Sequence, residues 1–209
     1  MIHIITAENR RHFHHALMEM HRQRKTVFID ELKWRLEESA GLEIDSYDSA
    51  DAIYLIEADA PRAPISVSAR LLPTTQPHLL GEIFPQLCSE PPPAGPAVWE
   101  ATRFCPAPGT PNGPARRAML GRIIAGIMET GLLFGIEQVT FVASAALAPL
   151  AARAGWAVRA LGPEQAIGRE RLTAFAADID STGLRQVKAR HDICGPLTRF
   201  MPGDLAHAA

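Results

Sequence analysis

Charged side chains divide the sequence into an acidic and a basic stretch. Residues 29–60 hold ten Asp or Glu residues, Asp45 and Asp48 among them, against two basic residues, whereas residues 101–128 hold four Arg and no acid. Two carboxylates three positions apart suit a cationic small molecule, and a basic helix start suits a phosphate or an acidic partner. Charge runs more often mark solvated surface, so the pattern alone also fits two ordinary exposed faces.

Three further charged residues fall within apolar segments. Arg70 lies on the more polar face of the expected strand 65–72, while Glu100 and Arg103 belong to the expected strand 97–104. Arg70 can hold a carboxylate by a two-pronged contact, and Glu100 is a candidate ion-pair partner for Arg103 or Arg70. Because residues three apart point to opposite faces of a regular strand, a bulge or the strand end must redirect Glu100 or Arg103 if both line one site.

Alternating apolar patterns predict the elements that position these residues. Nine prolines lie between Pro85 and Pro114, on both sides of strand 97–104, so this strand is expected between long irregular connections. Strands mixed with helices indicate an α/β (α+β) protein with a mixed sheet covered by helices. The expected strands are 2–5, 52–58, 65–72, 97–104, 138–143, 156–161 and 172–179. One helix is expected from about residue 8, and three more are expected over residues 114–134, 145–153 and 181–191.

The composition excludes several classes of protein. A chain of 209 residues with 47% hydrophobic residues suits one domain with a full core. The net charge of −2 argues against a nucleic-acid-coating protein, and no apolar run reaches the roughly 20 residues of a membrane-spanning helix. Without a visible secretory signal, and with three scattered cysteines that read as reduced thiols, we expect a cytoplasmic protein. The histidines near the start lack the carboxylate or Cys partners of a metal site.

Several polar and aromatic residues of the first half form an ordered series. They are Arg24, Phe28, Trp34, Asp45, Asp48, Arg70 within ARLLPTT, and Trp99, Glu100, Arg103 and Phe104 within WEATRF. In order and spacing this series resembles the acyl-homoserine-lactone synthases, the LuxI-type autoinducer synthases. The resemblance implies a GNAT-like acyltransferase fold, with a mostly antiparallel sheet and helices on both faces. It also implies one domain over residues 1–209, in which residues 1–50 form a helix and lid and residues 51–200 the acyltransferase core.

The resemblance also implies a reaction. S-adenosylmethionine gives its amino group to an acyl thioester, then closes to a lactone and releases methylthioadenosine, so it is a substrate and no cofactor is needed. A base must take a proton from the amine, and Glu100 is the candidate, with the ion-pair role an equal alternative. The implied catalytic residues are Glu100, Arg70, Arg103, Asp45 and Asp48, and those of the adenosylmethionine side are Arg24, Phe28, Trp34, Asp45 and Arg103.

An apolar slot for the acyl chain is expected between the halves of the sheet. Family members that prefer a 3-oxo chain often carry Thr at the position aligned with Phe141, so Phe141 favours an unsubstituted chain. Ordinary core packing explains every one of the slot candidates equally well. The candidates are Phe104, Met128, Leu132, Phe141 and Val142.

The acyl donor is expected to be acyl carrier protein, with coenzyme A as the alternative. Gly109 and Gly113 lack the spacing of a pyrophosphate-binding loop, and basic residues are available for an acidic carrier. Two other functions stay open: a GNAT-like acyltransferase that uses acyl-CoA on another amine, and a non-catalytic small-molecule binding domain. The expected docking residues are Arg116, Arg117, Arg122 and Arg153.

Overall fold

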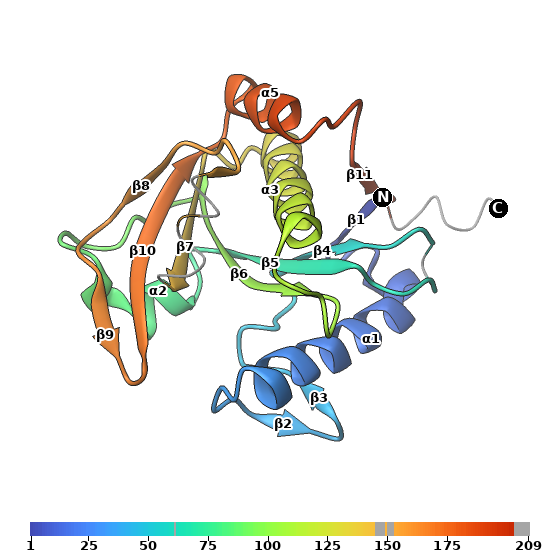
Figure 1. Ribbon diagram of the computed structural model, residues 1–209, viewed down its shortest axis with the longest axis horizontal. Helices are drawn as coiled ribbons and strands as arrows, with labels where there is room; N and C mark the ends of the chain where they lie inside the picture. Colours follow the sequence, from blue (N-terminus) through green and yellow to red (C-terminus); the bar gives the residue numbers. More distant parts are fainter. Residues whose placement is uncertain (61, 145–148, 150–152, 203–209) are drawn as a thin grey trace.

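A twisted sheet runs through the computed structural model, which describes residues 1–60, 62–144, 149 and 153–202 (Figure 1). Its strands lie in the order β11-β1-β4-β5-β6-β7-β10-β8, with β9 paired to β10. Neighbours are antiparallel except for the parallel pairs β1–β11 and β6–β7. The strands are β1 (Ile2–Ile5), β4 (Ile53–Glu57), β5 (Val67–Pro73), β6 (Val98–Pro106), β7 (Gln138–Ser144), β8 (Val158–Ala160), β9 (Gln165–Ile167), β10 (Glu170–Asp178) and β11 (Thr198–Phe200).

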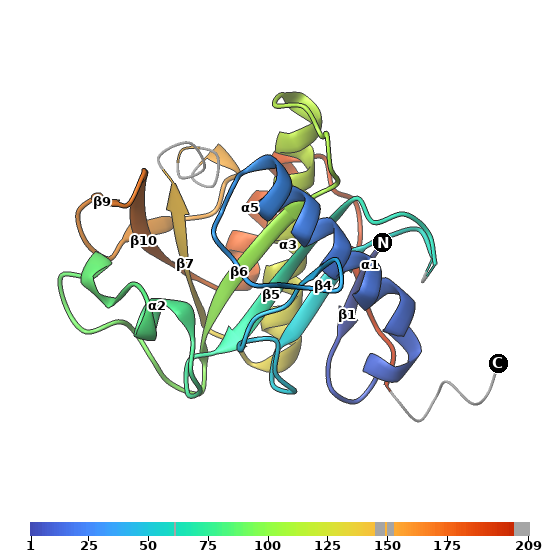
Figure 2. The same cartoon turned by 90° about the horizontal axis from the view of Figure 1, so that it is seen from below.

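Helices cover both faces of this sheet. Helix α3 packs against one face with α5 beside it, and α1 crosses β4 and β5 on the other face (Figure 2). A two-stranded ribbon of β2 (Glu38–Ser39) and β3 (Leu42–Glu43) lies next to α1. The helices are α1 (His14–Arg24), α2 (Leu79–Glu82), α3 (Pro114–Phe134) and α5 (Ser181–Arg190), with 3-10 turns η1 (Arg10–Phe13) and η3 (Pro85–Leu87) and the π-helix η2 (Lys25–Glu31).

Two apolar cores follow from the alternation of side chains along the strands. Leu55, Ala69 and Leu71 face α3, whereas Tyr54 and Leu72 face α1. Arg70 lies between two residues of the first set and therefore points toward α1, where it is fully buried. The hairpin of β4 and β5 thus brings a charged side chain into the layer beneath α1.

A β-bulge in β6 redirects Arg103. Ser68 of β5 pairs with Cys105 and Arg70 pairs with Thr102, so Ala69 alone opposes two residues of β6. Arg103 takes a left-handed conformation with φ of 53°, which is uncommon for a residue with a side chain. The bulge confirms that a local irregularity is needed to place Glu100 and Arg103 on one face.

The sheet opens beyond the middle of β6. The parallel pairing of β6 and β7 runs from Val98–Gln138 to Glu100–Thr140 in the described residues. Past that point the two strands separate, and residues 101–104 face residues 141–142 across a cavity. The cavity therefore results from the separation of the two strands, which form two of its walls.

Most predicted elements are confirmed, and the differences concern the ends of elements and the very short elements. Helix 114–134 has its predicted bounds, with Pro114 in its first turn and a left-handed Gly135 at its end. The predicted strand 156–161 is shorter, and the helix predicted from residue 8 begins as a 3-10 turn and ends as a π-helix. Helix 145–153 lies almost wholly outside the described residues. Short elements absent from the prediction, such as α2, β2, β3, β9 and β11, carry too few residues to show a period.

Within the described residues, no helix combines the length and apolar character needed to cross a membrane. The same residues contain no group of three or more His, Cys, Asp or Glu placed to hold a metal ion.

Candidate functional site

Arg24 anchors a buried ion-pair network beneath α1. It lies in the last turn of the helix, fully buried, and its two terminal nitrogens donate to the two carboxylate oxygens of Asp48 at 2.8 and 2.9 Å. Its Nε donates to Glu43. Burial opposes the charge of Asp48, but the hydrogen bonds and charge of Arg24, with the charge of Arg70, hold the pKa of Asp48 far below its ordinary value. Asp48 is therefore a permanent carboxylate.

Arg70 and Arg103 extend the network across the sheet. Arg70 donates to both oxygens of Asp45 at 2.6 and 3.0 Å, lies 2.8 Å from Asp48, and donates through Nε to the Thr102 hydroxyl. Arg103 donates to Asp45 at 2.6 Å and to Glu43 at 2.9 Å. Both arginines thus join carboxylates in the forked geometry that fixes side-chain orientation.

The network balances three arginines against three carboxylates. Glu43 is completely buried, and Asp45 is the most exposed of its acids, with 17% of its side chain accessible. The turn from Asp45 to Asp48 is itself hydrogen bonded, since the Asp45 amide donates to the Asp48 side chain and the Tyr47 amide to that of Asp45. A neutral, locked network of this kind can orient a polar substrate without offering it a large net charge.

Glu100 lies outside this network. Only 1% of the residue is exposed, the Leu80 amide donates to its Oε1 at 3.0 Å, and its Oε2 has no hydrogen-bond partner among the described residues. Burial raises the pKa of Glu100 to about 7, although the amides of Leu80 and Leu79 and the charges of Arg70 and Arg103 act in the opposite direction. Among the described residues no ion pair within 4 Å joins Glu100 to Arg70 or Arg103, so both roles stay predictions, and burial is the cause that favours the protonated carboxyl.

An aromatic pair lies at the edge of the network. The rings of Phe28 and Trp34 are stacked with centroids 4.9 Å apart, and the Arg103 guanidinium lies 5.7 Å from the Phe28 centroid. Phe28 is buried on the π-helix, whereas Trp34 is 40% exposed and follows Lys33, whose φ is 59°. The left-handed turn at Lys33 folds Trp34 back over Phe28, and its amide donates to the Phe28 carbonyl at 2.9 Å.

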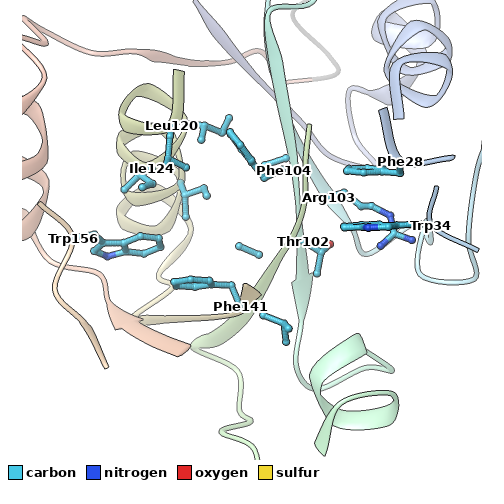
Figure 3. Close-up of a pocket in the computed structure, with 14 residues that line it drawn as sticks. Phe28, Trp34, Thr102, Arg103, Phe104, Leu120, Ile124, Phe141 and Trp156 are labelled. Carbon is cyan, nitrogen blue, oxygen red and sulfur yellow. The ribbon is translucent and has the colours of Figure 1, made fainter. Parts of the chain in front are cut away.

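A cavity of about 150 Å³ connects the aromatic pair to the apolar core. Figure 3 shows Phe28, Trp34 and Arg103 at one end and Trp156 at the other, with Phe104 and Phe141 between them. The remaining lining is mostly aliphatic and comes from α3 and the diverging strands. The lining residues not yet named are Ala69, Ala101, Thr102, Leu120, Ile123, Ile124, Ile127 and Val142.

Comparison with known proteins gives one family. Residues 8–187 match the autoinducer synthase family. An isovaleryl-homoserine lactone synthase of Bradyrhizobium diazoefficiens is 33% identical over 183 residues, 86% of this chain and 80% of that protein. An acyl-homoserine-lactone synthase of Acinetobacter nosocomialis is 33% identical over 162 residues, 75% of this chain and 88% of that protein.

The chain belongs to the autoinducer synthase family.

A solved structure supports the same conclusion. The CoA-dependent acyl-homoserine lactone synthase BjaI, solved with SAM and isopentyl-CoA, is 28% identical and has a TM-score of 0.88 over 100% of this chain and 98% of its own. The expected GNAT-like fold is thereby confirmed. This autoinducer synthase is an acyltransferase that makes an acyl-homoserine lactone signal for quorum sensing.

The structure separates the predicted acyl-slot residues of this autoinducer synthase. Phe104, Phe141 and Val142 line the cavity. Met128 and Leu132 do not line it: Met128 is fully buried near Gly183 of α5, and Leu132 is 45% exposed. Both lie on α3 beyond the part of the helix that faces the diverging strands.

The predicted docking arginines also divide. Arg117 and Arg153 are exposed, and Arg116 is half-buried in the first turn of α3, which leads to the cavity-lining residue Leu120. Arg122 instead forms an ion pair with Glu57 of β4. Its charge is therefore paired within the protein, although 37% of its side chain stays exposed.

Sequence reasoning missed several residues of the site. Glu43 binds both Arg24 and Arg103, yet it was one acid among ten in its segment. Its alternation with Asp45 in an extended stretch is a signal that could have found it, because residues two apart face the same side. Thr102 and the Leu80 amide carry no comparable signal, since their roles depend on contacts distant in sequence.

Proposed function

We propose that this autoinducer synthase makes a short-chain N-acyl-homoserine lactone from S-adenosylmethionine and an acyl-CoA. The observation that carries the proposal is the buried carboxyl of Glu100 beside a locked ion-pair network, one member of which, Arg103, lines an apolar cavity. The comparisons support the short chain and the donor, since a curated relative is named an isovaleryl-homoserine lactone synthase and a similar CoA-dependent synthase was solved with isopentyl-CoA.

Adenosylmethionine is proposed to bind at the end of the cavity formed by Phe28, Trp34 and Arg103. Aromatic ring faces attract a sulfonium cation, and Arg103 can hold the substrate carboxylate while Asp45 accepts from its ammonium group. In this arrangement residues 1–50 act as the lid and residues 51–200 as the acyltransferase core. Arg24 and Arg70 touch no part of the cavity, so we assign them to positioning Asp48 and Asp45.

The acyl thioester is proposed to enter along the open edge of β6. Beyond Glu100 this strand has no pairing with β7 in the described residues, so its backbone groups are available to the amides of a pantetheine arm. Coenzyme A and acyl carrier protein share that arm, and the similarity to a CoA-dependent synthase favours the coenzyme. The Thr140 hydroxyl donates to the Trp99 carbonyl at 3.4 Å, away from the cavity, which supports an unsubstituted acyl chain.

Glu100 is proposed to act as the general base. It does not line the cavity, so it takes the proton of the amine through a water molecule. The amine nitrogen then forms a bond to the thioester carbonyl carbon, the C–S bond breaks, and the thiolate of coenzyme A leaves. In the second step the substrate carboxylate attacks the carbon next to the sulfonium, which closes the lactone and releases methylthioadenosine.

Mass spectrometry of purified reactions tests this proposal. The protein is incubated with adenosylmethionine and either isovaleryl-CoA or the same acyl group on acyl carrier protein. We expect isovaleryl-homoserine lactone, formed faster from the CoA thioester. Acylation without methylthioadenosine would instead indicate another N-acyltransferase, and binding of adenosylmethionine without any product would indicate a binding domain.

A further inference from the structure

The stacked rings of Phe141 and Trp156 form one wall of the cavity, and Phe175 stacks on Phe141 without lining the cavity. Phe141 lies between Trp156, at a centroid distance of 5.8 Å, and Phe175, at 5.4 Å, and the planes of each pair differ by no more than 21°. Phe141 and Phe175 are direct partners across β7 and β10. Figure 3 places Trp156 at the end of the cavity opposite Phe28 and Trp34.

Trp156 is held in place from several sides. It is 5% exposed, and its indole N–H donates to the Asp178 carbonyl at 3.3 Å. The residue before it, Gly155, has a φ of 88°, and a Cβ there would lie 3.2 Å from the Arg190 side chain. A ring with a fixed hydrogen bond, a stacked neighbour and a constrained backbone has little freedom to move aside for a longer ligand.

The volume in front of this wall limits the acyl group. The cavity measures about 150 Å³ in total, including the part next to Phe28 and Trp34. An apolar cavity of ~150 Å³ in another protein holds one benzene molecule. An acyl chain of about six carbons or fewer therefore fills the available space.

We propose that Trp156, supported by Phe141 and Phe175, sets the upper limit of acyl-chain length in this enzyme. The proposal rests on the proposed function, because it assigns the cavity to the acyl chain. Longer chains meet the indole ring before their thioester carbonyl reaches the region of Thr102 and Arg103, so they react slowly rather than bind elsewhere in the cavity.

The test compares kcat/KM for isovaleryl-CoA and octanoyl-CoA in matched variants. Trp156→Phe keeps an aromatic ring but shortens it, and Trp156→Ala removes it. We expect the octanoyl to isovaleryl ratio to rise on the order of 10-fold in Trp156→Phe and further in Trp156→Ala, since one methylene in an apolar pocket changes the rate by about 10-fold or more. Leu132→Ala, on an exposed part of α3 outside the cavity, should leave the ratio unchanged.

A second variant, which adds volume to the cavity lining, keeps the test valid if Trp156→Ala does not fold. Ile124→Phe narrows the same cavity and should lower the activity with hexanoyl-CoA relative to butyryl-CoA by about 10-fold. An unchanged chain-length profile in folded Trp156→Phe and Ile124→Phe overturns the inference, as does a wild-type preference for octanoyl-CoA. Wild-type protein that makes no lactone from any donor overturns the proposed function instead, so the two failures are distinct.

Discussion

Four acids lie close together in this enzyme, and they differ in the groups that donate hydrogen bonds to them. Glu43, Asp45 and Asp48 each receive hydrogen bonds from arginine side chains. Glu100 receives them from the backbone, and its second oxygen has no partner in the described part of the chain. The charged form is therefore strongly favoured at Asp48 and disfavoured at Glu100. This division suits one base and three positioning carboxylates.

The pH dependence of the reaction follows from Glu100. A base with a pKa of about 7 is protonated below that pH, so kcat/KM should fall as pH drops through 7. Glu100→Gln should lower kcat by roughly 100-fold or more. The matched control is Glu137→Gln, an exposed acid outside the cavity, which should keep both the rate and the profile. A Glu100→Gln enzyme with wild-type kcat would contradict the assignment.

The same carboxyl should lower the stability of the folded protein at neutral pH. Its folded pKa is about 7 against an ordinary value of 4.5, so the folded state holds more protons between these values and stability falls as pH rises through that window. Removing the charge in Glu100→Gln should raise the free energy of unfolding at pH 8 by on the order of 3 kcal/mol. Urea unfolding at pH 4 and pH 8 measures the effect, and equal differences at both pH values would speak against it.

The π-helix η2 and the turn that follows it carry two aromatic residues with different expected roles, one in stability and one in substrate binding. Phe28 is buried and should cost about 3 kcal/mol of unfolding free energy on change to Ala. Trp34 is stacked on Phe28 but 40% exposed, so Trp34→Ala should cost about 1 kcal/mol. Its KM for adenosylmethionine should rise about 10-fold, in the range of a lost cation–ring contact. Steady-state kinetics with denaturant unfolding measures both, and an unchanged KM would exclude a lid role for Trp34.

Elements with clear local signals were predictable and elements made by distant contacts were not. Helix α3 has 21 residues, with a proline in its first turn and a glycine after its last residue, and its bounds match the prediction. The bulge at Arg103 was predicted from a conflict between strand geometry and a shared site, which is a physical argument. The two-residue strands around Glu43 and the short helix above Glu100 depend on tertiary packing, because neither is long enough to be stable alone.

Several of the acidic residues that cluster in the sequence are paired with arginines in the folded molecule. The acidic stretch suggested an open anionic site, but Glu43, Asp45 and Asp48 are neutralised by Arg24, Arg70 and Arg103. Glu57 of the same stretch is paired with Arg122. The network therefore offers oriented groups more than a net charge, and the start of α3 carries the half-buried Arg116 and the exposed Arg117.

We expect Arg116 and Arg117 to contribute to binding of the acyl donor. Changing both Arg116 and Arg117 to Glu should raise KM for the acyl-CoA by about 10-fold at low salt, with a smaller effect at high salt, because exposed charges are screened. KM for adenosylmethionine should stay the same. Arg185→Glu on α5 is an exposed control of the same charge type. A double variant with an unchanged donor KM at low salt would place the donor elsewhere.

The proposed function requires that one enzyme carries out both acylation and lactone closure. The most direct measurement is the initial rate of methylthioadenosine release beside that of acyl-homoserine lactone formation, in wild type and in Glu100→Gln, with isovaleryl-CoA as the donor. We predict equal rates in the wild type and a parallel loss of both in the variant. Methylthioadenosine released without lactone, or lactone formed at an unchanged rate by Glu100→Gln, would contradict it.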